Sequence, residues 1–491
     1  MVVPAVVIGL SACTLTPEAT PPTIIPDIET LPRYLNEQQS DEGTTTLNQS
    51  IAWWRRIGGP DLDHLVEQLI ARNFDLAEAR ARVRQAEART RQARSGRLPA
   101  ISANGEASRT RSQGLDGSFS WSDGYAVGAS GSWAADIFGG IRTAERSARL
   151  AAAAARASYG TSEQQQIAAL AKSYVAAATL QRRLALALSI AESFRVTYQL
   201  TDERYQAGSR SVTASDVQIA KQNLDTALVD IPDLQTQLTT QLLAIDAQLA
   251  RLPGTTARSF RGTLNVDRTP QVPVGLPATL LTQRPDVATA ELRYRAALED
   301  IGSARADLFP ALTLTASLTF QDEDLSGLFS WQDHIANLAG SLVQPVFQGG
   351  RLRAAIKLER AEAEELAAAY GRTAITAVTE VETALAEQAG FAEQLRRLES
   401  AVTSAQTSNE IAQRRFREGL NTILSVLETQ RSLNNTRQSV LLTEQALLNA
   451  RIDLFLSLGG AWFETDTPNA TADVIGRVDT RERRSMLGEG S

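Results

Sequence analysis

Few residues of this chain have side chains suited to catalysis or metal binding. The 491 residues include one cysteine, Cys13, and two histidines, His64 and His334. One cysteine cannot form a disulfide framework, and two isolated histidines do not make the clustered ligand set of a structural or catalytic metal site. A hydrolase would have only scattered acidic residues and these two histidines to work with, and there is no phosphate-binding loop of the Gly-x-x-x-x-Gly-Lys type. We therefore predict a protein that is not an enzyme and has no metal and no cofactor.

The one chemically distinctive residue is Cys13, which follows an apolar run over residues 2–12. That run is far shorter than the roughly 20 residues of a transmembrane helix, and it has the length of the apolar core of a signal peptide. Leu10-Ser11-Ala12-Cys13 resembles the lipobox of bacterial lipoproteins, in which small residues admit the peptidase and the thiol receives a diacylglyceryl group. We expect a signal peptide at 1–12 and a lipidated N-terminal tether at 13–50, with the covalent lipid on Cys13. The alternative is a short buried strand that ends in an ordinary core cysteine.

The charge balance bears on the partners of the protein. Lys and Arg together number 49 and Asp and Glu 56, which gives a formal net charge of −7. Because phosphate recognition needs clustered positive charge, this balance argues against a nucleic-acid partner.

The elements that would position functional residues recur along the chain at one spacing. Asp75 and Asp286, Pro99 and Pro310, and Gly208 and Gly419 are three pairs that each differ by 211. Chance rarely maintains one offset over more than a hundred residues, so we predict two equivalent repeats, at about 60–250 and 270–460, followed by a flexible C-terminal tail at 464–491.

Each repeat begins with a helical segment and continues with residues that alternate in polarity. Within residues 311–320, every second residue from Leu312 to Phe320 is leucine, alanine or phenylalanine, and the residues between them are threonine or serine. This is the pattern of a strand with one apolar and one polar face. The strands are predicted at about 99–111, 125–136, 311–320 and 335–345. The loops between them, 112–124 and 321–334, carry Trp121 and Trp331, with Tyr125 and Phe329 nearby, as an aromatic girdle at a membrane interface would. A soluble two-sided sheet is the alternative.

Long helical runs without proline follow, at about 141–207 and 351–418, and each is expected to turn back as an antiparallel helix through 211–250 and 421–458. Gly208 and Gly419 lie where the turns must occur, and glycine favours the left-handed end of a helix. About 67 residues at 1.5 Å each make a rod of roughly 100 Å, which needs a bundle or coiled-coil environment.

Four strands of this length can cross a bilayer but cannot close into a barrel, which needs about eight. An open sheet edge is not tolerated in lipid, so several chains must share one barrel. The predicted fold class is an α+β membrane protein with a β-barrel that several chains share and that continues into a long α-helical barrel; three chains of four strands each would give a trimeric 12-stranded β-barrel, the arrangement that the family resemblance described next implies.

The sequence resembles the outer membrane factor family, the TolC/OprM/NodT group of outer-membrane efflux channels, over about residues 50–463. The segments that carry the resemblance are Trp53-Trp54, Asn73-Phe-Asp-Leu76, Arg284-Pro-Asp286, Ala304-Arg-Ala-Asp-Leu-Phe-Pro310, Pro345-Val-Phe-Gln-Gly-Gly-Arg351, the two tip glycines and Leu458-Gly-Gly-Ala-Trp462.

The resemblance implies a homotrimer in the bacterial outer membrane, with the helical part in the periplasm. It also implies two protein partners, a periplasmic adaptor and an inner-membrane pump of the RND or ABC type. The function would be that of a passive duct in a tripartite multidrug or other efflux system. The alternatives are the outer-membrane component of type I protein secretion, or a structural coiled-coil lipoprotein.

The resemblance also suggests site residues near the two hairpin tips. The closed periplasmic aperture would include Leu424 as an apolar constriction and Glu428 as an acidic ring, and Arg431, three residues later on the same helical face, could latch it. Asp216 is a further aperture candidate from the first repeat. The candidate adaptor-docking residues at the tips are Arg204, Gly208, Arg415 and Gly419.

Overall fold

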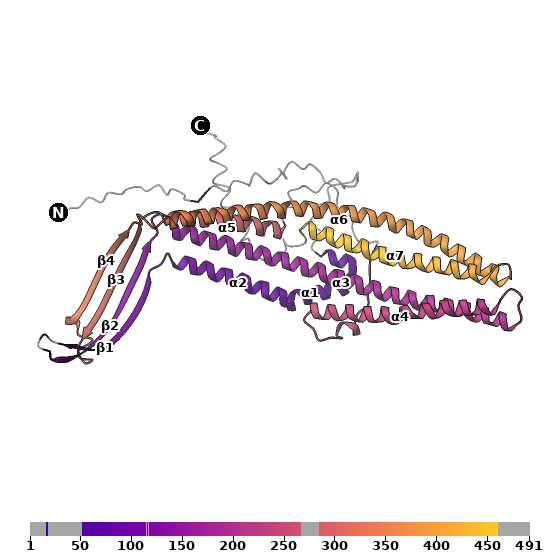
Figure 1. Cartoon of the computed structure of the whole chain (residues 1–491), viewed down its shortest axis with the longest axis horizontal. Helices are drawn as coiled ribbons and strands as arrows, with labels where there is room; N and C mark the ends of the chain where they lie inside the picture. The colour runs from indigo at the N-terminus through magenta and orange to yellow at the C-terminus, as the bar shows by residue number, and fades with distance from the viewer. Residues whose placement is uncertain (1–15, 18–51, 114, 116, 267–283, 460–491) are drawn as a thin grey trace, which may run out of the picture. The chain divides into compact units, whose positions relative to one another are not determined.

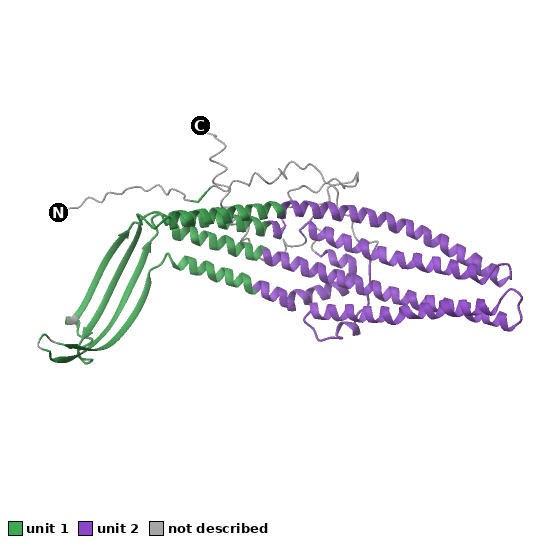
Figure 2. Cartoon of the chain, viewed as in Figure 1, with its two compact units in different colours: residues 1–25, 81–157, 288–372 green, residues 26–80, 158–287, 373–491 purple. Residues whose placement is uncertain are grey.

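The computed structural model describes residues 16–17, 52–113, 115, 117–266 and 284–459. The chain forms two compact units, each built from discontinuous segments (Figure 2). Unit 1 comprises residues 1–25, 81–157 and 288–372, and unit 2 comprises residues 26–80, 158–287 and 373–491. The predicted signal peptide, Cys13, nearly all of the tether and the predicted tail lie outside the described residues.

Unit 1 contains a four-stranded antiparallel sheet in the order β1-β2-β3-β4 (Figure 1). The strands are β1 (Ala100–Gln113), β2 (Phe119–Ala135), β3 (Ala311–Asp322) and β4 (His334–Val343). The central pair, β2 and β3, joins segments almost 200 residues apart, with Ala129 opposite Leu318. A single sheet therefore draws two strands from each half of the sequence, and within the described residues β1 and β4 are its two open edges.

Strand β2 begins six residues before the predicted start at 125, so the expected loop over 112–124 is in part strand. Residues 119–122 alternate between aromatic and serine, and they pair with the end of β1, with Trp121 opposite Arg111 and Ser120 opposite Ser112. The serine and aspartate content indicated a turn, but cross-strand pairing extends the hairpin.

Two long hairpins carry the rest of the chain, and their helices have matching lengths. Helices α3 (Gly140–Gln206) and α6 (Arg351–Arg417) have 67 residues each, which corresponds to roughly 100 Å. Helices α4 (Ala214–Gln248) and α7 (Ile423–Ser457) have 35 residues each. Shorter elements complete the described part: α1 (Trp53–Arg72), α2 (Phe74–Ser95), α5 (Pro285–Ala306) and the 3₁₀ turns Thr256–Arg258 and Trp331–Asp333. Among the described residues, no helix combines the length and the apolar character that crossing a membrane requires.

The predicted helical segment at the start of the first repeat is divided at Asn73 into two helices, α1 and α2. Asn73 has non-helical backbone angles (φ −59°, ψ 132°), its side-chain oxygen accepts a hydrogen bond from the Leu76 amide (3.0 Å), and its side-chain nitrogen donates to the Gln248 carbonyl (2.8 Å). Asparagine thus starts α2 as a helix cap, which outweighs the high helix propensity of its neighbours.

The described residues of unit 2 form two hydrophobic clusters. The larger joins α1 to α3, α4 and α7 around the buried Leu69, Tyr174 and Ile452. The smaller lies near the hairpin ends, where Phe194, Phe416 and Leu427 bring α3, α6 and α7 together. The two hairpins therefore pack against each other close to their tips, and the geometry of one tip depends on the other.

Candidate functional site

The sheet of unit 1 has one apolar and one polar face. The register places Ala129 opposite Leu318 and Ala316 opposite Leu338, so apolar side chains of all four strands project to the same side. The apolar set is Ile101, Ala103, Tyr125, Val127, Ala129, Trp133, Leu312, Leu314, Ala316, Leu318, Phe320, Ala336, Leu338 and Leu342. The other face carries mainly hydroxyl side chains, including Ser102 and Ser130, whose oxygens are 2.9 Å apart.

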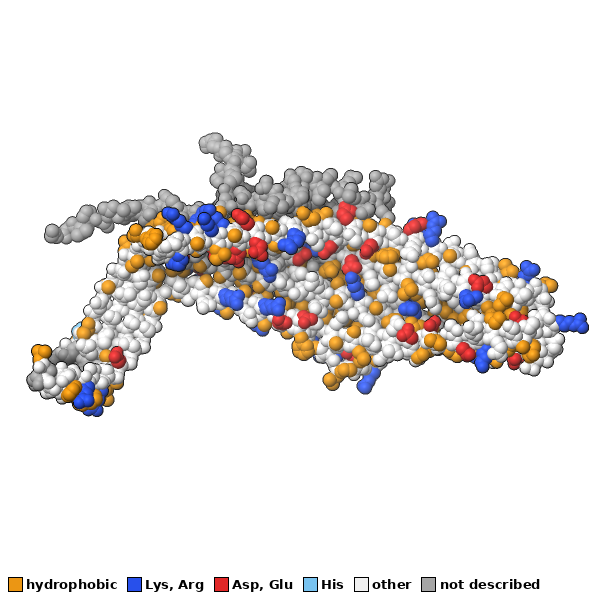
Figure 3. Space-filling view, viewed as in Figure 1, with side chains coloured by type: hydrophobic (Ala, Val, Ile, Leu, Met, Phe, Trp, Pro, Cys, Tyr) orange, Lys and Arg blue, Asp and Glu red, His pale blue; other side chains and the backbone are white. Residues whose placement is uncertain are grey.

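The apolar face has no cover within the described chain. Ile101 is 80% exposed, Leu338 84% and Leu342 65%. Soluble monomers rarely expose a contiguous apolar surface across a whole sheet, so this face fits hydrocarbon. In the space-filling view, the side of the sheet that faces the reader consists mostly of uncharged polar side chains and backbone, with almost no charged side chains in its middle (Figure 3).

Aromatic side chains gather at both ends of the strands. At the β1–β2 turn, the Arg111 guanidinium lies 4.1 Å from the centre of the Phe119 ring, and beside β4 Trp331 stacks on His334 at 4.5 Å. At the opposite end, Phe138 stacks on Phe309 at 4.8 Å. Two aromatic rims around an apolar band match the arrangement at the two interfaces of a membrane barrel.

The two hairpin tips have the same backbone geometry. Gly208 and Gly419 both have positive φ, 73° and 78°. The amide of each glycine donates to the carbonyl three residues earlier, and the amide that follows donates to the carbonyl of Arg204 or Arg415. A side chain at either glycine would strain this left-handed turn, which satisfies the last carbonyls of α3 and α6.

Arg204 joins the two tips. Its guanidinium donates to the carbonyls of Phe416 (2.6 Å) and Arg417, and it lies 4.8 Å from the centre of the Phe416 ring. These carbonyls are at the C-terminal end of α6, where a cation is favoured. Arg415, the matching residue of the second tip, is exposed and has no side-chain hydrogen bond or ion pair among the residues that the structure describes.

The three aperture candidates of the second repeat lie on the first turns of α7. The Arg431 guanidinium is 2.7 Å from the Glu428 carboxylate, and both side chains are well exposed, at 59% and 71%. Leu424, one turn before Glu428, is 54% exposed. An exposed ion pair of this kind stabilises a single chain by at most about 1 kcal/mol, so neither charge is needed to hold α7 in place.

Asp216 has a local structural task at the start of α4. Its carboxylate accepts hydrogen bonds from the amide and the hydroxyl of Thr213, both at 2.8 Å, while its own amide donates to that hydroxyl. This is a reciprocal capping box. The structure does not bring Asp216 into contact with Glu428 or Arg431, and its carboxylate is already engaged by Thr213.

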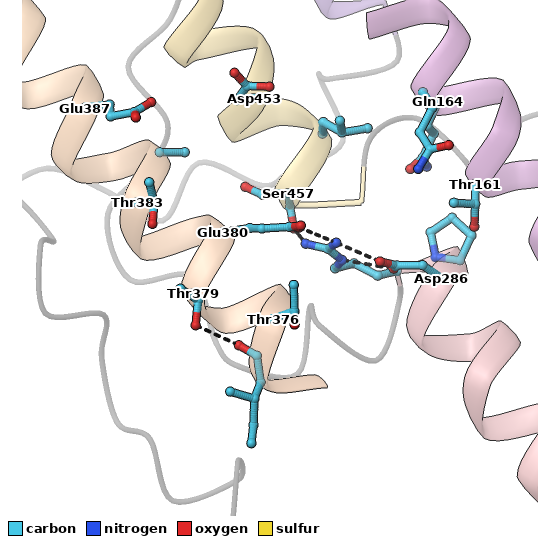
Figure 4. Close-up of a pocket in the computed structure, with 16 residues that line it drawn as sticks. Thr161, Gln164, Asp286, Thr376, Thr379, Glu380, Thr383, Glu387, Asp453 and Ser457 are labelled. Atoms are coloured by element: carbon cyan, nitrogen blue, oxygen red, sulfur yellow. Dashed lines mark hydrogen bonds and ion pairs between the residues drawn. The ribbon is translucent and has the colours of Figure 1, made fainter. Parts of the chain in front are cut away.

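A polar pocket of about 520 Å³ lies in unit 2 beside the first turn of α5 (Figure 4). Arg284, only 6% exposed, is held there by Asp286 (2.8 Å), by Glu380 (2.6 Å) and by the carbonyl of Ser457 (2.9 Å). Burial alone would raise the pKa of Asp286, but the hydrogen bonds and charge of Arg284 outweigh burial and lower that pKa below its usual value. The guanidinium fastens α5, α6 and α7 together, and we interpret this group as structural.

Some of these contacts had a signal in the sequence and others did not. The capping box has the local signature Thr213-x-x-Asp216 just before an amphipathic run, which could have identified the role of Asp216. The contacts of Arg204 with Phe416 and of Arg284 with Glu380 join residues 212 and 96 positions apart, so no local pattern indicates them.

Comparison with known proteins gives consistent matches. Residues 65–251 and 276–460 each match the family model described as outer membrane efflux protein. The chain is 32% identical over 440 residues to the pyoverdine export outer membrane protein OpmQ of Pseudomonas aeruginosa, covering 88% of this chain and 90% of that protein. It is 27% identical over 474 residues to the probable efflux pump outer membrane protein TtgC of Pseudomonas putida, covering 95% and 96%. The solved outer-membrane channel OprN superposes with a TM-score of 0.80 at 26% identity, over 92% of this chain and 100% of that one.

Proposed function

The chain belongs to the outer membrane efflux protein family and is an outer-membrane efflux channel component rather than an enzyme, and from this premise we propose that three copies form one passive duct. The main support is the uncovered apolar face of the four-stranded sheet. Its edge strands β1 and β4 need partners in lipid. Two copies would supply eight strands, which close around packed side chains, whereas three supply twelve and leave room for a channel.

The two equivalent halves that we propose would make this ring nearly sixfold in its helical part. Helices α3 and α6 begin 211 residues apart (351 − 140) and end 211 apart (417 − 206). Helices α4 and α7 begin 209 apart (423 − 214), so the first tip is two residues longer. Three chains of two hairpins would give twelve helices in a wall that surrounds the duct.

The helical hairpins would project into the periplasm, with their tips docked on a periplasmic adaptor and, through it, an inner-membrane pump of the RND or ABC type. The backbone around Gly208 and Gly419 is accessible for that contact, and Arg415 is exposed in the single chain, while Arg204 holds the two tips together. The pump would supply the energy, and docking would open the duct by binding the splayed tip arrangement more tightly than the closed one.

Cys13 would carry the lipid that anchors the mature chain, in a role separate from that of the sheet. We expect Cys13→Ser to abolish incorporation of radiolabelled palmitate, while the trimer still assembles because the strands, and not the acyl chains, span the bilayer. Labelling and the trimer's mass in detergent can be measured on the same preparation. Undiminished labelling of the serine variant would contradict lipidation at Cys13.

Leu424, Glu428 and Arg431 would form the closed periplasmic aperture, with Asp216 a weaker candidate because of its capping role. Three copies would bring three Glu428–Arg431 pairs near the axis. We expect Glu428→Gln and Arg431→Gln each to raise single-channel conductance in planar bilayers by roughly twofold or more, since ion pairs that these charges would make between neighbouring copies, and not the pair within one helix, would hold the constriction closed. A matched control is Glu192→Gln, whose carboxylate pairs with Arg195 within α3 at 2.7 Å and is also exposed.

The same bilayer experiment tests the proposed function. A monomer without channel activity would refute the duct, whereas a conducting trimer whose conductance is unaffected by both substitutions would refute only the aperture assignment.

A further inference from the structure

We infer that Arg415 of one copy binds the C-terminal end of helix α3 in the next copy, in the way that Arg204 binds the end of α6 within the chain. This inference rests on the trimer proposed above. It assigns residues to the tip contact between copies and commits to a second copy of this chain as the partner of Arg415.

The contact within the chain shows what one such junction contains. The Arg204 guanidinium covers the Phe416 ring at 4.8 Å and donates to the carbonyls of Phe416 and Arg417. Phe416 is only 2% exposed in this arrangement. An aromatic ring and two terminal helix carbonyls together form the acceptor site for one guanidinium.

The chain carries a second arginine, a second aromatic ring and a second helix end, each 211 positions from its equivalent in this junction. Adding 211 to 204 gives Arg415, and subtracting 211 from 416 and 417 gives Tyr205 and Gln206. The backbone hydrogen bonds agree as well, because the Tyr205 carbonyl accepts from Gly208 (3.0 Å) as the Phe416 carbonyl accepts from Gly419 (3.0 Å). The end of α3 therefore offers the acceptor site that the end of α6 offers.

Among the described residues of the single chain, no guanidinium occupies the acceptor site at the end of α3. Tyr205 is 41% exposed, compared with 2% for the equivalent Phe416, and the Arg415 side chain is exposed. Ile411, one turn before Arg415, is 49% exposed, whereas its equivalent Leu200 packs on the cluster between the hairpins. The Arg415 guanidinium and its proposed acceptor site at the end of α3 are both on the surface of the chain. Each would form one half of a junction between two copies.

Heterologous contacts of this kind close into a ring when the rotation per copy allows it. Within one chain, Arg204 of the first tip binds the second tip. Between chains, Arg415 of the second tip would bind the first tip of the next copy. A trimer would then contain six tip junctions, three within chains and three between chains, and in each of them a tip would bind the next tip around the ring. An adaptor could also contact Arg415, but it would not explain why the chain itself carries the matching ring and carbonyls at Tyr205 and Gln206.

Cross-linking tests the proximity. In a Cys13→Ser background, Gln206→Cys with Arg415→Cys is treated with a short bis-maleimide and analysed on denaturing gels. We expect bands up to a covalent trimer. The matched control is Arg204→Cys with Arg417→Cys, the equivalent pair within one chain, which should cross-link intramolecularly and remain a monomer band.

Native mass measurement in detergent separates the possible failures. A trimer by mass that gives no intermolecular bands, while the control pair reacts, would overturn the inference and leave the proposed duct intact. A monomer by mass would overturn both.

A second measurement tests the arginine itself. Arg415→Ala should raise amide hydrogen exchange at residues 205–213 of the trimer about tenfold, since charge-assisted hydrogen bonds to the end of α3 are lost. Arg414→Ala, which removes an exposed arginine one position earlier, should leave that exchange unchanged. If Arg415→Ala does not alter exchange but weakens adaptor binding, the adaptor is the partner of Arg415 and the inference is wrong.

Discussion

Leu338→Arg is expected to abolish assembly in the outer membrane, whereas Asn337→Arg, at the adjacent position of β4, is expected to leave it intact. Leu338 lies in the middle of the strand opposite Ala316, on the apolar face, and is 84% exposed. Asn337 lies opposite Ser317, on the polar face. An arginine on the lipid side at mid-membrane costs roughly 2–4 kcal/mol, or roughly 6–12 kcal/mol for three copies, while an arginine on the channel side stays in water.

The pair is a controlled test because both substitutions add the same side chain at neighbouring positions of one strand. Heat-resistant trimer in the outer-membrane fraction should be lost in Leu338→Arg and retained in Asn337→Arg, and the mass in detergent should agree. Equal loss in both variants would mean that β4 tolerates no arginine for reasons unrelated to lipid. Equal retention would mean that the apolar face does not contact the membrane.

The strand faces could be predicted from sequence to different extents because the four strands differ in composition. In residues 312–320 leucine, alanine and phenylalanine alternate with threonine and serine, and β3 (Ala311–Asp322) covers that stretch. Strand β1 has glycine and alanine on its apolar face, so its alternation is weak. Its place depends on pairing with β2, where Ala103 lies opposite Ala129. Because small side chains bury little apolar surface, strand β1 cannot be recognised from its own sequence alone. Pairing with β2 provides the additional stabilisation.

At the hairpin tips, too, some features follow from the local sequence and others depend on contacts between residues far apart in the sequence. A glycine at the end of a 67-residue helix predicts a turn by itself, and both tip glycines have positive φ. The neighbours of Arg204 and Arg415 could not be predicted, because two arginines at equivalent positions have the same local sequence signals. One is half-buried against Phe416 and the other is exposed in the single chain. Under the inference above, a contact between copies, and not local propensity, would distinguish the two.

The largest effect on stability in unit 2 is expected from Arg284→Met. The substitution would leave the Asp286 and Glu380 carboxylates and the Ser457 carbonyl without their shared donor. Removing one member of a buried ion pair destabilises a protein by roughly 3–5 kcal/mol, and we expect about 3 kcal/mol here because Glu380 is half-exposed. Glu380→Gln is the matched control, with an expected cost of at most about 1 kcal/mol, because that carboxylate is the more exposed partner. Urea unfolding of the detergent-solubilised protein, followed by circular dichroism, measures both.

The pH dependence distinguishes a lost ion pair from a simple loss of packing. In the wild type the pKa of Asp286 is lowered, so its stabilising contribution is present above the usual aspartate pKa and is lost as the pH falls through the lowered value. In Arg284→Met, burial acts without the opposing guanidinium and raises the pKa of Asp286, so acidification neutralises the carboxylate and removes part of the penalty. The deficit of the variant should therefore be smaller at pH 5 than at pH 7.5. A deficit that is independent of pH would mean that Arg284 supports α5, α6 and α7 through its packing alone.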